Sequence, residues 1–333
     1  MTRSRGMAVV SALLCAALAT AGCGLGPGAD VGDVGLTVTR EYGAVPVLDT
    51  SVSAKESDTV MRVLEGEADV ETRYGGGFVH EIDGVAEGSR DGDPYDWFFY
   101  VDGVESPIGA AEYDLEGGER VWWDYRDWGA TNHAPAVVGS WPAPFTDGIG
   151  GERHPVTLEC LEPPRGSFRT HSVQKEPRVC EATRGALERE GVEVATGEPN
   201  DAIRVLVGPW AQVRKDPAAA QIEAGPAESG VFADFQPGVR PFPGMGGERT
   251  NADAEYELLA LDEAGKVGRD LGPDAGLVAA TSRYDGLPVW VVTGGSTAGA
   301  RVAAEALDAD HLRDHYAVAI SNGETMPLPL EER

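Results

Sequence analysis

The sequence is short of positive charge and of long apolar runs. Its 333 residues include 27 Lys and Arg against 55 Asp and Glu, a formal net charge of −28. A chain with this charge repels phosphate, which excludes nucleic acid as a partner and excludes a basic patch for an anionic membrane. No run reaches the roughly 20 apolar residues that a membrane-spanning helix needs.

The longest uncharged apolar run, Met7 to Ala21, has 15 residues and follows two arginines. This pattern is typical of a secretion signal. The run ends in Thr20-Ala21-Gly22-Cys23, which resembles the lipobox of bacterial lipoproteins. The resemblance implies removal of residues 1–22, a diacylglycerol on the Cys23 sulfur, and an extracytoplasmic protein anchored to the membrane by this lipid. The alternative is an ordinary cleaved signal in which Cys23 falls by chance.

Cysteine is also scarce, with four residues in the chain. Cys15 leaves with the signal and Cys23 would carry the lipid, so Cys160 and Cys180 remain as an even pair in an oxidising compartment, where a disulfide is the simplest expectation. A metal site with His154 and His171 is an alternative, but the spacing is unlike the tight cysteine pairs of zinc sites. Two free thiols are the third interpretation.

Composition divides the remaining chain into four segments. Residues 23–34 are Gly-rich and predict a flexible tether, and residues 129–155 are rich in Pro and Gly and predict a linker. The segments 35–128 and 156–330 carry the periodic apolar patterns of folded domains. Residues 24–128 hold 24 acidic and 7 basic side chains, so we expect the first domain to disfavour anionic ligands.

Strand-like runs and one short helix make up the first domain. The spacing of Val60, Val63 and Leu64 predicts a helix that Asp58 caps and Gly66 ends. The expected strands are 36–38, 45–48, 78–82, 97–101 and 121–125, with a tight hairpin turn at Asp102-Gly103. This pattern predicts a small α+β domain.

Three motifs in this domain carry a family resemblance. They are Trp97-x-x-Tyr100-Val101-Asp102-Gly103, Gly109-Ala110-x-x-Tyr113-x-Leu115 and Gly118-Glu119-x-Val121-x-Trp123. The series resembles the transcobalamin-type C-terminal domain over residues 35–128, under a third of the chain. The resemblance implies a β-grasp fold. It also implies a ligand-binding role, since the related domain of animal cobalamin carriers covers one face of the corrin. Those carriers cover the other face with a helical barrel, which has no counterpart here.

The aromatic residues of the first domain are the candidates for ligand binding: Trp97, Tyr100, Tyr113, Trp122 and Trp123. Strand alternation places Trp122 on one face and Trp123 on the other, and the face away from the helix is free to carry an exposed aromatic. We expect Trp122 to be that residue, and the alternative is that most of these rings fill the core. The acidic run 91–96 is either a calcium loop or a solvated turn.

The second domain alternates strands with helices, which predicts an α/β layered domain. The expected strands are 156–160, 203–207, 257–261, 277–280, 289–292 and 316–320, and the expected helices are 180–189, 210–222 and 296–307. It contains no G-x-S-x-G motif and no thiol in a nucleophilic setting, so we do not expect an enzyme.

These features predict a lipid-anchored extracytoplasmic binding protein. Its ligand would be a corrinoid, such as cobalamin, or another small molecule that it passes to a membrane transporter. We assign no metal site from the sequence. The alternative is a cell-surface interaction or scaffold lipoprotein with no small-molecule ligand.

Overall fold

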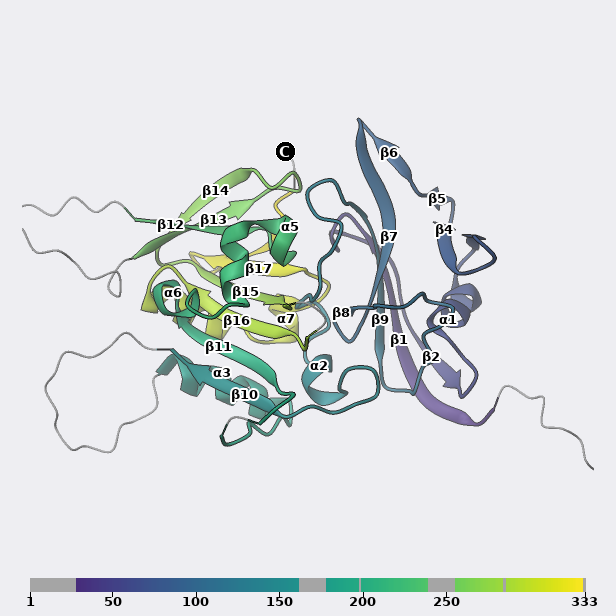
Figure 1. The fold of residues 1–333 in the computed structure, drawn as a ribbon, viewed down its shortest axis with the longest axis horizontal. Coiled ribbons are helices and arrows are strands. Elements are labelled where there is room, and N and C mark those ends of the chain that lie inside the picture. Colours follow the sequence, from purple (N-terminus) through teal and green to yellow (C-terminus); the bar gives the residue numbers. More distant parts are fainter. Residues whose placement is uncertain (1–27, 162–177, 198, 239–254, 284–285, 332–333) are drawn as a thin grey trace, which may run out of the picture.

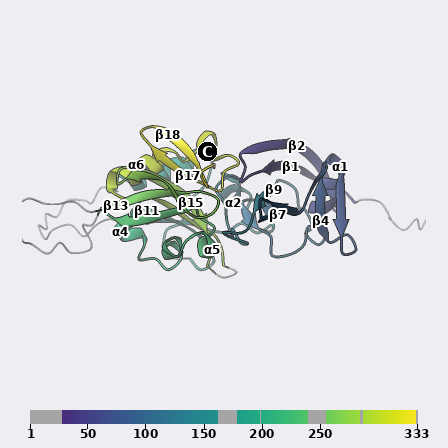
Figure 2. The ribbon, with the colours of Figure 1, turned by 90° about the horizontal axis from the view of Figure 1, so that it is seen from above.

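The computed structural model describes residues 28–161, 178–197, 199–238, 255–283 and 286–331. Its architecture is mixed α+β, with many strands and few, short helices. Two bodies pack side by side, the N-terminal one on the right of Figure 1 and the C-terminal one on the left; Figure 2 shows them from above. The predicted signal, Cys23 and His171 lie outside the described residues. In the described part, no helix is long and apolar enough to cross a membrane.

The N-terminal body has two sheets and one α-helix. Its elements are β1 (Asp30–Arg40), β2 (Val45–Lys55), α1 (Val60–Glu67), β3 (Val70–Arg73), β4 (Phe78–Ile82), β5 (Val85–Ala86), β6 (Gly88–Arg90), β7 (Asp93–Val101), β8 (Val104–Glu105) and β9 (Arg120–Asp127). The main sheet has the order β2-β1-β9-β7-β6, with β8 paired to β7, and β3-β4-β5 form a small sheet. The first strand, β1, runs parallel to β9 at the centre of the main sheet.

Alternating apolar side chains explain why these elements pack together. The inward-facing residues of β1 and β9 and the buried side of α1 form one core. Its fully buried members include Val34, Leu36, Val38, Val60, Leu64 and Val121. The helix therefore covers one face of the main sheet, and the side chains on the other face need a different cover.

Three predicted boundaries in this body are wrong. Thr59, not Asp58, caps α1 by accepting a hydrogen bond from a backbone N–H, because the Asp58 carboxylate already accepts one from the preceding turn. Gly66 lies inside the helix rather than ending it. The predicted tether also ends earlier than expected, because β1 pairs with β2 from Asp30 onward and Val34 is fully buried.

The predicted two-residue turn Asp102-Gly103 joins β7 to β8, where Val101 pairs with Val104. Both turn residues have positive φ, which Asp and Gly tolerate. The Asp102 carboxylate is buried and accepts a hydrogen bond of 2.8 Å from Arg120 N–H. Burial raises the pKa of this carboxyl from its ordinary 3.8 to about 7.

Asp102 makes the stability of this body depend on pH. Between its unfolded and folded pKa values, 3.8 and about 7, the folded protein holds a proton that the unfolded chain has released. The free energy of unfolding therefore falls as pH rises through this window, by about 4 kcal/mol at most. Asp102→Asn keeps the acceptor oxygen and removes the titration, so the variant should lack this loss. Chemical unfolding at about pH 5 and about pH 8 measures the difference, and an equal pH dependence in both proteins would contradict it.

The C-terminal body is built on a six-stranded sheet and a three-stranded sheet. Its elements are β10 (Val156–Cys160), α3 (Arg178–Arg189), β11 (Ile203–Pro209), α4 (Trp210–Val213), η1 (Ala219–Ala224), α5 (Pro226–Ser229), β12 (Ala233–Pro237), β13 (Tyr256–Leu261), β14 (Val267–Gly272), β15 (Gly276–Thr281), β16 (Val289–Gly294), α6 (Thr297–Glu305), α7 (Ala309–Leu312), β17 (Ala317–Ser321) and β18 (Glu324–Leu328). The sheet orders are β10-β11-β16-β15-β17-β18 and β12-β13-β14.

Only part of the larger sheet has the parallel strands that are typical of an α/β domain. Strands β10, β11 and β16 are parallel, whereas β15, β17 and β18 are joined by antiparallel pairs. The predicted helix 210–222 is also wrong as a single element. Pro217 interrupts it, and the Asp216 side chain accepts a hydrogen bond from the next turn, so two short helices, α4 and η1, form instead.

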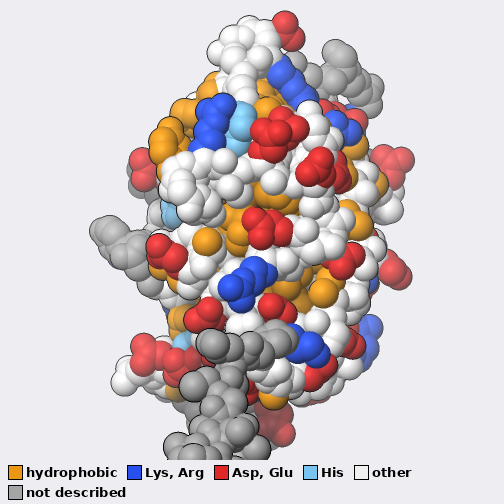
Figure 3. All heavy atoms as spheres, turned by 90° about the vertical axis from the view of Figure 1, so that its right-hand side faces the viewer, with side chains coloured by type: hydrophobic (Ala, Val, Ile, Leu, Met, Phe, Trp, Pro, Cys, Tyr) orange, Lys and Arg blue, Asp and Glu red, His pale blue; other side chains and the backbone are white. Residues whose placement is uncertain are grey.

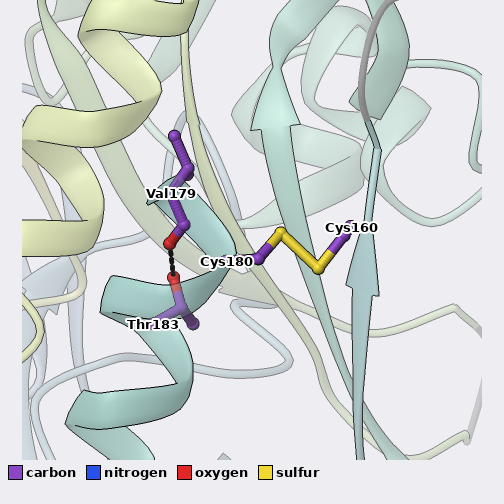
Figure 4. Close-up of a disulfide and its surroundings, with 4 residues drawn as sticks. All are labelled: Cys160, Val179, Cys180 and Thr183. Carbon is purple, nitrogen blue, oxygen red and sulfur yellow. Dashed lines mark hydrogen bonds between the residues drawn. A yellow bond between two sulfur atoms is a disulfide. The ribbon is translucent and has the colours of Figure 1, made fainter. Parts of the chain in front are cut away.

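The predicted disulfide between Cys160 and Cys180 is confirmed. Cys160 ends β10 and Cys180 lies in the first turn of α3, with Cα atoms 5.9 Å apart (Figure 4). In the same turn, Thr183 Oγ1 donates a hydrogen bond of 3.1 Å to the Val179 carbonyl (Figure 4). The disulfide therefore links β10, the edge strand of the larger sheet, to helix α3.

Removing this disulfide should destabilise the C-terminal body. The two cysteines are separated by 20 positions. Closing a loop of this size lowers the conformational entropy of the unfolded chain, which raises its free energy by about 3 kcal/mol. The Cys160→Ser, Cys180→Ser double variant should lose that amount in urea unfolding, and the reduced wild-type protein should match it. An unchanged unfolding midpoint in both samples would contradict the expectation.

The predicted linker 129–155 packs against both bodies. Trp141 and Phe145, the latter in helix α2 (Ala143–Thr146), are buried against Trp290 of β16, with ring centroids 5.6 and 4.9 Å away. Gly139 lies so close to the β9 side chain Trp122 that a Cβ there would be 2.8 Å from its ring. The segment therefore joins the two bodies along their contact.

Candidate functional site

Strands β7 and β9 sort their aromatic side chains onto two faces of the sheet. Trp97 pairs with Tyr125 and Phe99 with Trp123 on the face toward α1, while Tyr100 pairs with Trp122 on the opposite face. The predicted site residues are therefore split between two environments.

Trp122 is not exposed, so the prediction for this residue is wrong. It is 2% exposed, and its ring packs 5.3 Å from the ring of Tyr316 in the C-terminal body. Its Nε1 donates a hydrogen bond of 2.8 Å to Thr39 Oγ1. Tyr100 lies beside it and is fully buried. The C-terminal body supplies the cover for this face, which makes both rings part of the junction and not a ligand surface.

Two charged residues are buried at the same junction. The Asp124 carboxylate accepts hydrogen bonds from Thr39 Oγ1 (2.6 Å), Gly43 N–H (3.1 Å) and Tyr316 Oη (3.1 Å). Burial raises the pKa of this carboxyl, and Arg126 counteracts that rise. The Arg126 guanidinium, which is fully buried, lies over the ring of Phe98 at 3.7 Å in a cation–π contact.

The hydrogen bond from Tyr316 to Asp124 should stabilise the folded protein. Tyr316→Phe leaves the packing in place and removes one donor to a buried carboxylate, so the free energy of unfolding should fall by about 1–3 kcal/mol. Tyr74→Phe is the matched control, because Tyr74 is 87% exposed and should change nothing. Equal stability of the two variants would show that the bond contributes nothing.

The other face of β7 and β9 borders a groove of about 230 Å³. Trp97 and Trp123 lie on its buried side, while Phe99 and Phe78 are half-buried at its edge. The rings of Phe99 and Trp123 stack with centroids 4.8 Å apart. Two of the five predicted residues, Trp97 and Trp123, are thus brought together in a hollow. Its remaining lining includes Asp96, Glu105, Ser106, Gly109 and Ala110.

Hydrogen bonds fix some groove groups and leave others unused. Trp97 Nε1 donates to the Val85 carbonyl at 2.9 Å, which anchors the small sheet to β7. Trp123 Nε1 is buried without a hydrogen-bond partner among the described residues. Burial raises the pKa of Asp96 at the groove edge. The fifth predicted residue, Tyr113, lies beside the start of α1, where its carbonyl accepts from Val60 N–H, and does not line the groove.

The surface around the groove is apolar and acidic. Tyr74, at the tip between β3 and β4, is 87% exposed, and Ile108 is 45% exposed. Figure 3 shows this end of the molecule, with hydrophobic side chains lying between acidic ones. Sequence reasoning missed Phe99 and Phe78. Phe99 lies two residues after Trp97 on β7, so strand alternation indicated that their rings share one face. No pattern linked Phe78 to this strand.

A larger hollow of about 800 Å³ lies where the two bodies meet. It is lined by Glu41 and Tyr42 after β1 and by Asp262, Arg269 and Glu331 from the C-terminal body. No sequence motif indicated it, because its walls come from segments far apart in the chain. Its mixed charges and open form give it no convergent set of ligand groups.

The described residues contain one group of three metal-ligating side chains close together: Glu71, His80 and Glu81. The acidic run 91–96, considered as a calcium loop, does not form such a group. Its residues belong to the β6–β7 hairpin, where the Asp96 carboxylate accepts a hydrogen bond from Trp97 N–H.

Fold and site together describe a two-body, β-rich protein with an aromatic groove in its N-terminal body. Residues 57–127 match the family model of a domain of unknown function (DUF4430). This range begins two residues before Thr59, the cap of α1, and ends with β9. A matching solved structure is described as "a putative metal binding protein from Ruminococcus gnavus"; it is 17% identical, covers 29% of this chain and 97% of that chain, and has a TM-score of 0.23. No curated protein matches the chain.

Proposed function

We propose that this chain is a lipid-anchored extracytoplasmic binding protein that captures a flat, ring-shaped ligand of the corrinoid class for a membrane importer. The observation that carries the proposal is the aromatic groove, where Trp97, Phe99 and Trp123 of the main sheet meet Phe78 of the small sheet. We assign no catalytic role to the chain.

A β-grasp assignment of the N-terminal body underlies the proposal. The first and last strands of the body, β1 and β9, pair in parallel at the centre of the sheet, and each has an antiparallel neighbour, β2 and β7. Helix α1 packs across one face. This arrangement supports the resemblance to the transcobalamin-type domain, whose motif residues fall on β7, its turn, the loop between β8 and β9, and β9 itself.

The size of the groove favours a ligand that is only partly enclosed. Its volume of about 230 Å³ is below the range of about 300–1,000 Å³ that holds a whole small molecule. A flat ring can instead lay one face or edge on the half-buried rings of Phe78 and Phe99. The other face of the ligand stays open to a second protein, as transfer to an importer requires.

Charge narrows the ligand further. Asp96 and Glu105 line the groove, and the chain has a net charge of −28, so an anionic ligand would be repelled. The Glu105 carboxylate is also engaged with Ala134 N–H at 2.9 Å, which leaves aromatic stacking as the main source of affinity. A neutral or cationic ring suits this surface.

The location rests on two features of the sequence. Thr20-Ala21-Gly22-Cys23 supplies the lipidation signal, and acyl chains on Cys23 would hold the protein at the membrane. The disulfide between Cys160 and Cys180 is consistent with an oxidising, extracytoplasmic compartment.

Isothermal titration of the purified chain with cobalamin tests the proposal. We expect saturable binding at or below tens of micromolar, and Phe99→Ala should weaken it at least tenfold because a stacking surface of the groove is lost. Trp128→Ala is the matched control, since Trp128 is 39% exposed and lies outside the groove. Heat that does not saturate, or equal affinity in the wild type and Phe99→Ala, would contradict the corrinoid assignment and favour the scaffold alternative.

A further inference from the structure

The hairpin formed by β3 and β4 contains a β-bulge. Glu71 pairs with Glu81, but the next pair along the hairpin is Thr72 with Val79, so His80 is an extra residue on β4. Side chains normally alternate between the two faces of a strand, and a bulge is what lets two consecutive residues share one face. His80 and Glu81 can therefore both face the side chain of Glu71.

This arrangement gathers three metal-ligating groups on the outer face of the hairpin. One ligand atom from each of Glu71, His80 and Glu81 lies within 4.8 Å of the other two. Two carboxylates directly opposite each other on paired strands repel, which destabilises the hairpin unless a cation lies between them. Ligands on a zinc ion, with bonds of about 2.0–2.2 Å, lie roughly 3.3–3.6 Å apart in a tetrahedral site. Rotation of the exposed Glu71 side chain and the half-buried Glu81 side chain would close that gap.

The contacts of His80 put its imidazole in the form that ligates metals. Arg73 Nη2 lies 2.9 Å from His80 Nε2, and a guanidinium can only donate, so Nε2 offers a lone pair. Glu87 Oε1 lies 3.3 Å from His80 Nδ1, the side on which a carboxylate commonly orients a metal-ligating histidine. Nδ1 itself is shielded from solvent and forms no hydrogen bond of good geometry among the described residues.

Arg73 is a cation that lies against one member of this group, His80. Its guanidinium contacts both Glu87 and His80, so a positive charge already lies at the imidazole lone pair. A metal ion would take the place of this contact with His80 and leave the ion pair between Arg73 and Glu87 intact.

We propose that Glu71, His80 and Glu81 bind one divalent transition-metal ion, with Zn²⁺ as the probe. An imidazole with two carboxylates suits Zn²⁺ better than Ca²⁺ or Mg²⁺, which prefer oxygen ligands only. Three protein ligands leave the remaining position of the ion to water or to an external group. The site lies on the small sheet and does not depend on a ligand in the aromatic groove.

Titration of the purified, EDTA-treated chain with ZnCl₂ tests the site by calorimetry. We expect one ion per chain, a loss of affinity of at least tenfold in His80→Ala, and a weaker loss in Glu71→Gln. His154→Ala is the matched control in the C-terminal body and should bind as the wild type does. Arg73→Ala removes a competing positive charge and should bind Zn²⁺ more tightly, an effect that a purely structural role of His80 would not produce.

Melting curves in EDTA separate folding from binding. Glu71 is exposed, so Glu71→Gln keeps the test decisive even if His80→Ala disturbs the hairpin. Wild-type affinity in both His80→Ala and Glu71→Gln would overturn the proposal. So would displacement of Zn²⁺ by an equal concentration of Ca²⁺, because that preference would mean an oxygen-only site.

Discussion

The hydrogen bond from Tyr316 Oη to the Asp124 carboxylate joins the two bodies. The burial around this bond determines which face of the main sheet the C-terminal body covers and which face stays open. A buried carboxylate is tolerated only when its oxygens are satisfied, and here three donors from three segments do so. With Tyr100 and Trp122 buried on this face, the groove forms on the α1 side, where Phe99 is half-buried. The position of the groove is thus a consequence of the junction.

Local pattern was sufficient to predict most of the longer strands, the hairpin turn at Asp102-Gly103 and the disulfide, but it did not indicate β3, β14 or β18. Each of the predicted features depends on residues close in sequence or on a simple count of cysteines. The aromatic site was predicted only in part. Alternation separated Trp122 from Trp123 correctly, but which of the two faces meets water is decided by Tyr316, nearly two hundred residues away. No local rule contains that information.

The metal-ligating residues of the β3–β4 hairpin could not be predicted from the sequence either. Glu71, His80 and Glu81 have no motif spacing, and strict alternation would place His80 and Glu81 on opposite faces. A single unpaired residue changes that, and a bulge of this kind has no reliable signature in one sequence. The groove and the hairpin group both lie within the region 57–127, so the matched domain carries both proposed sites while the C-terminal body covers its back.

The early start of β1 would limit how far a lipid-anchored form of the protein can stand from a membrane. If the lipid is carried by Cys23, seven peptide steps separate it from Asp30, the first residue of the sheet. Fully extended, they span about 25 Å at most. A chain anchored in this way would sample a shallow layer above the bilayer, within direct reach of the outer loops of a membrane protein. With that anchor, the short spacing would favour partners embedded in the same membrane over partners that rise far above it.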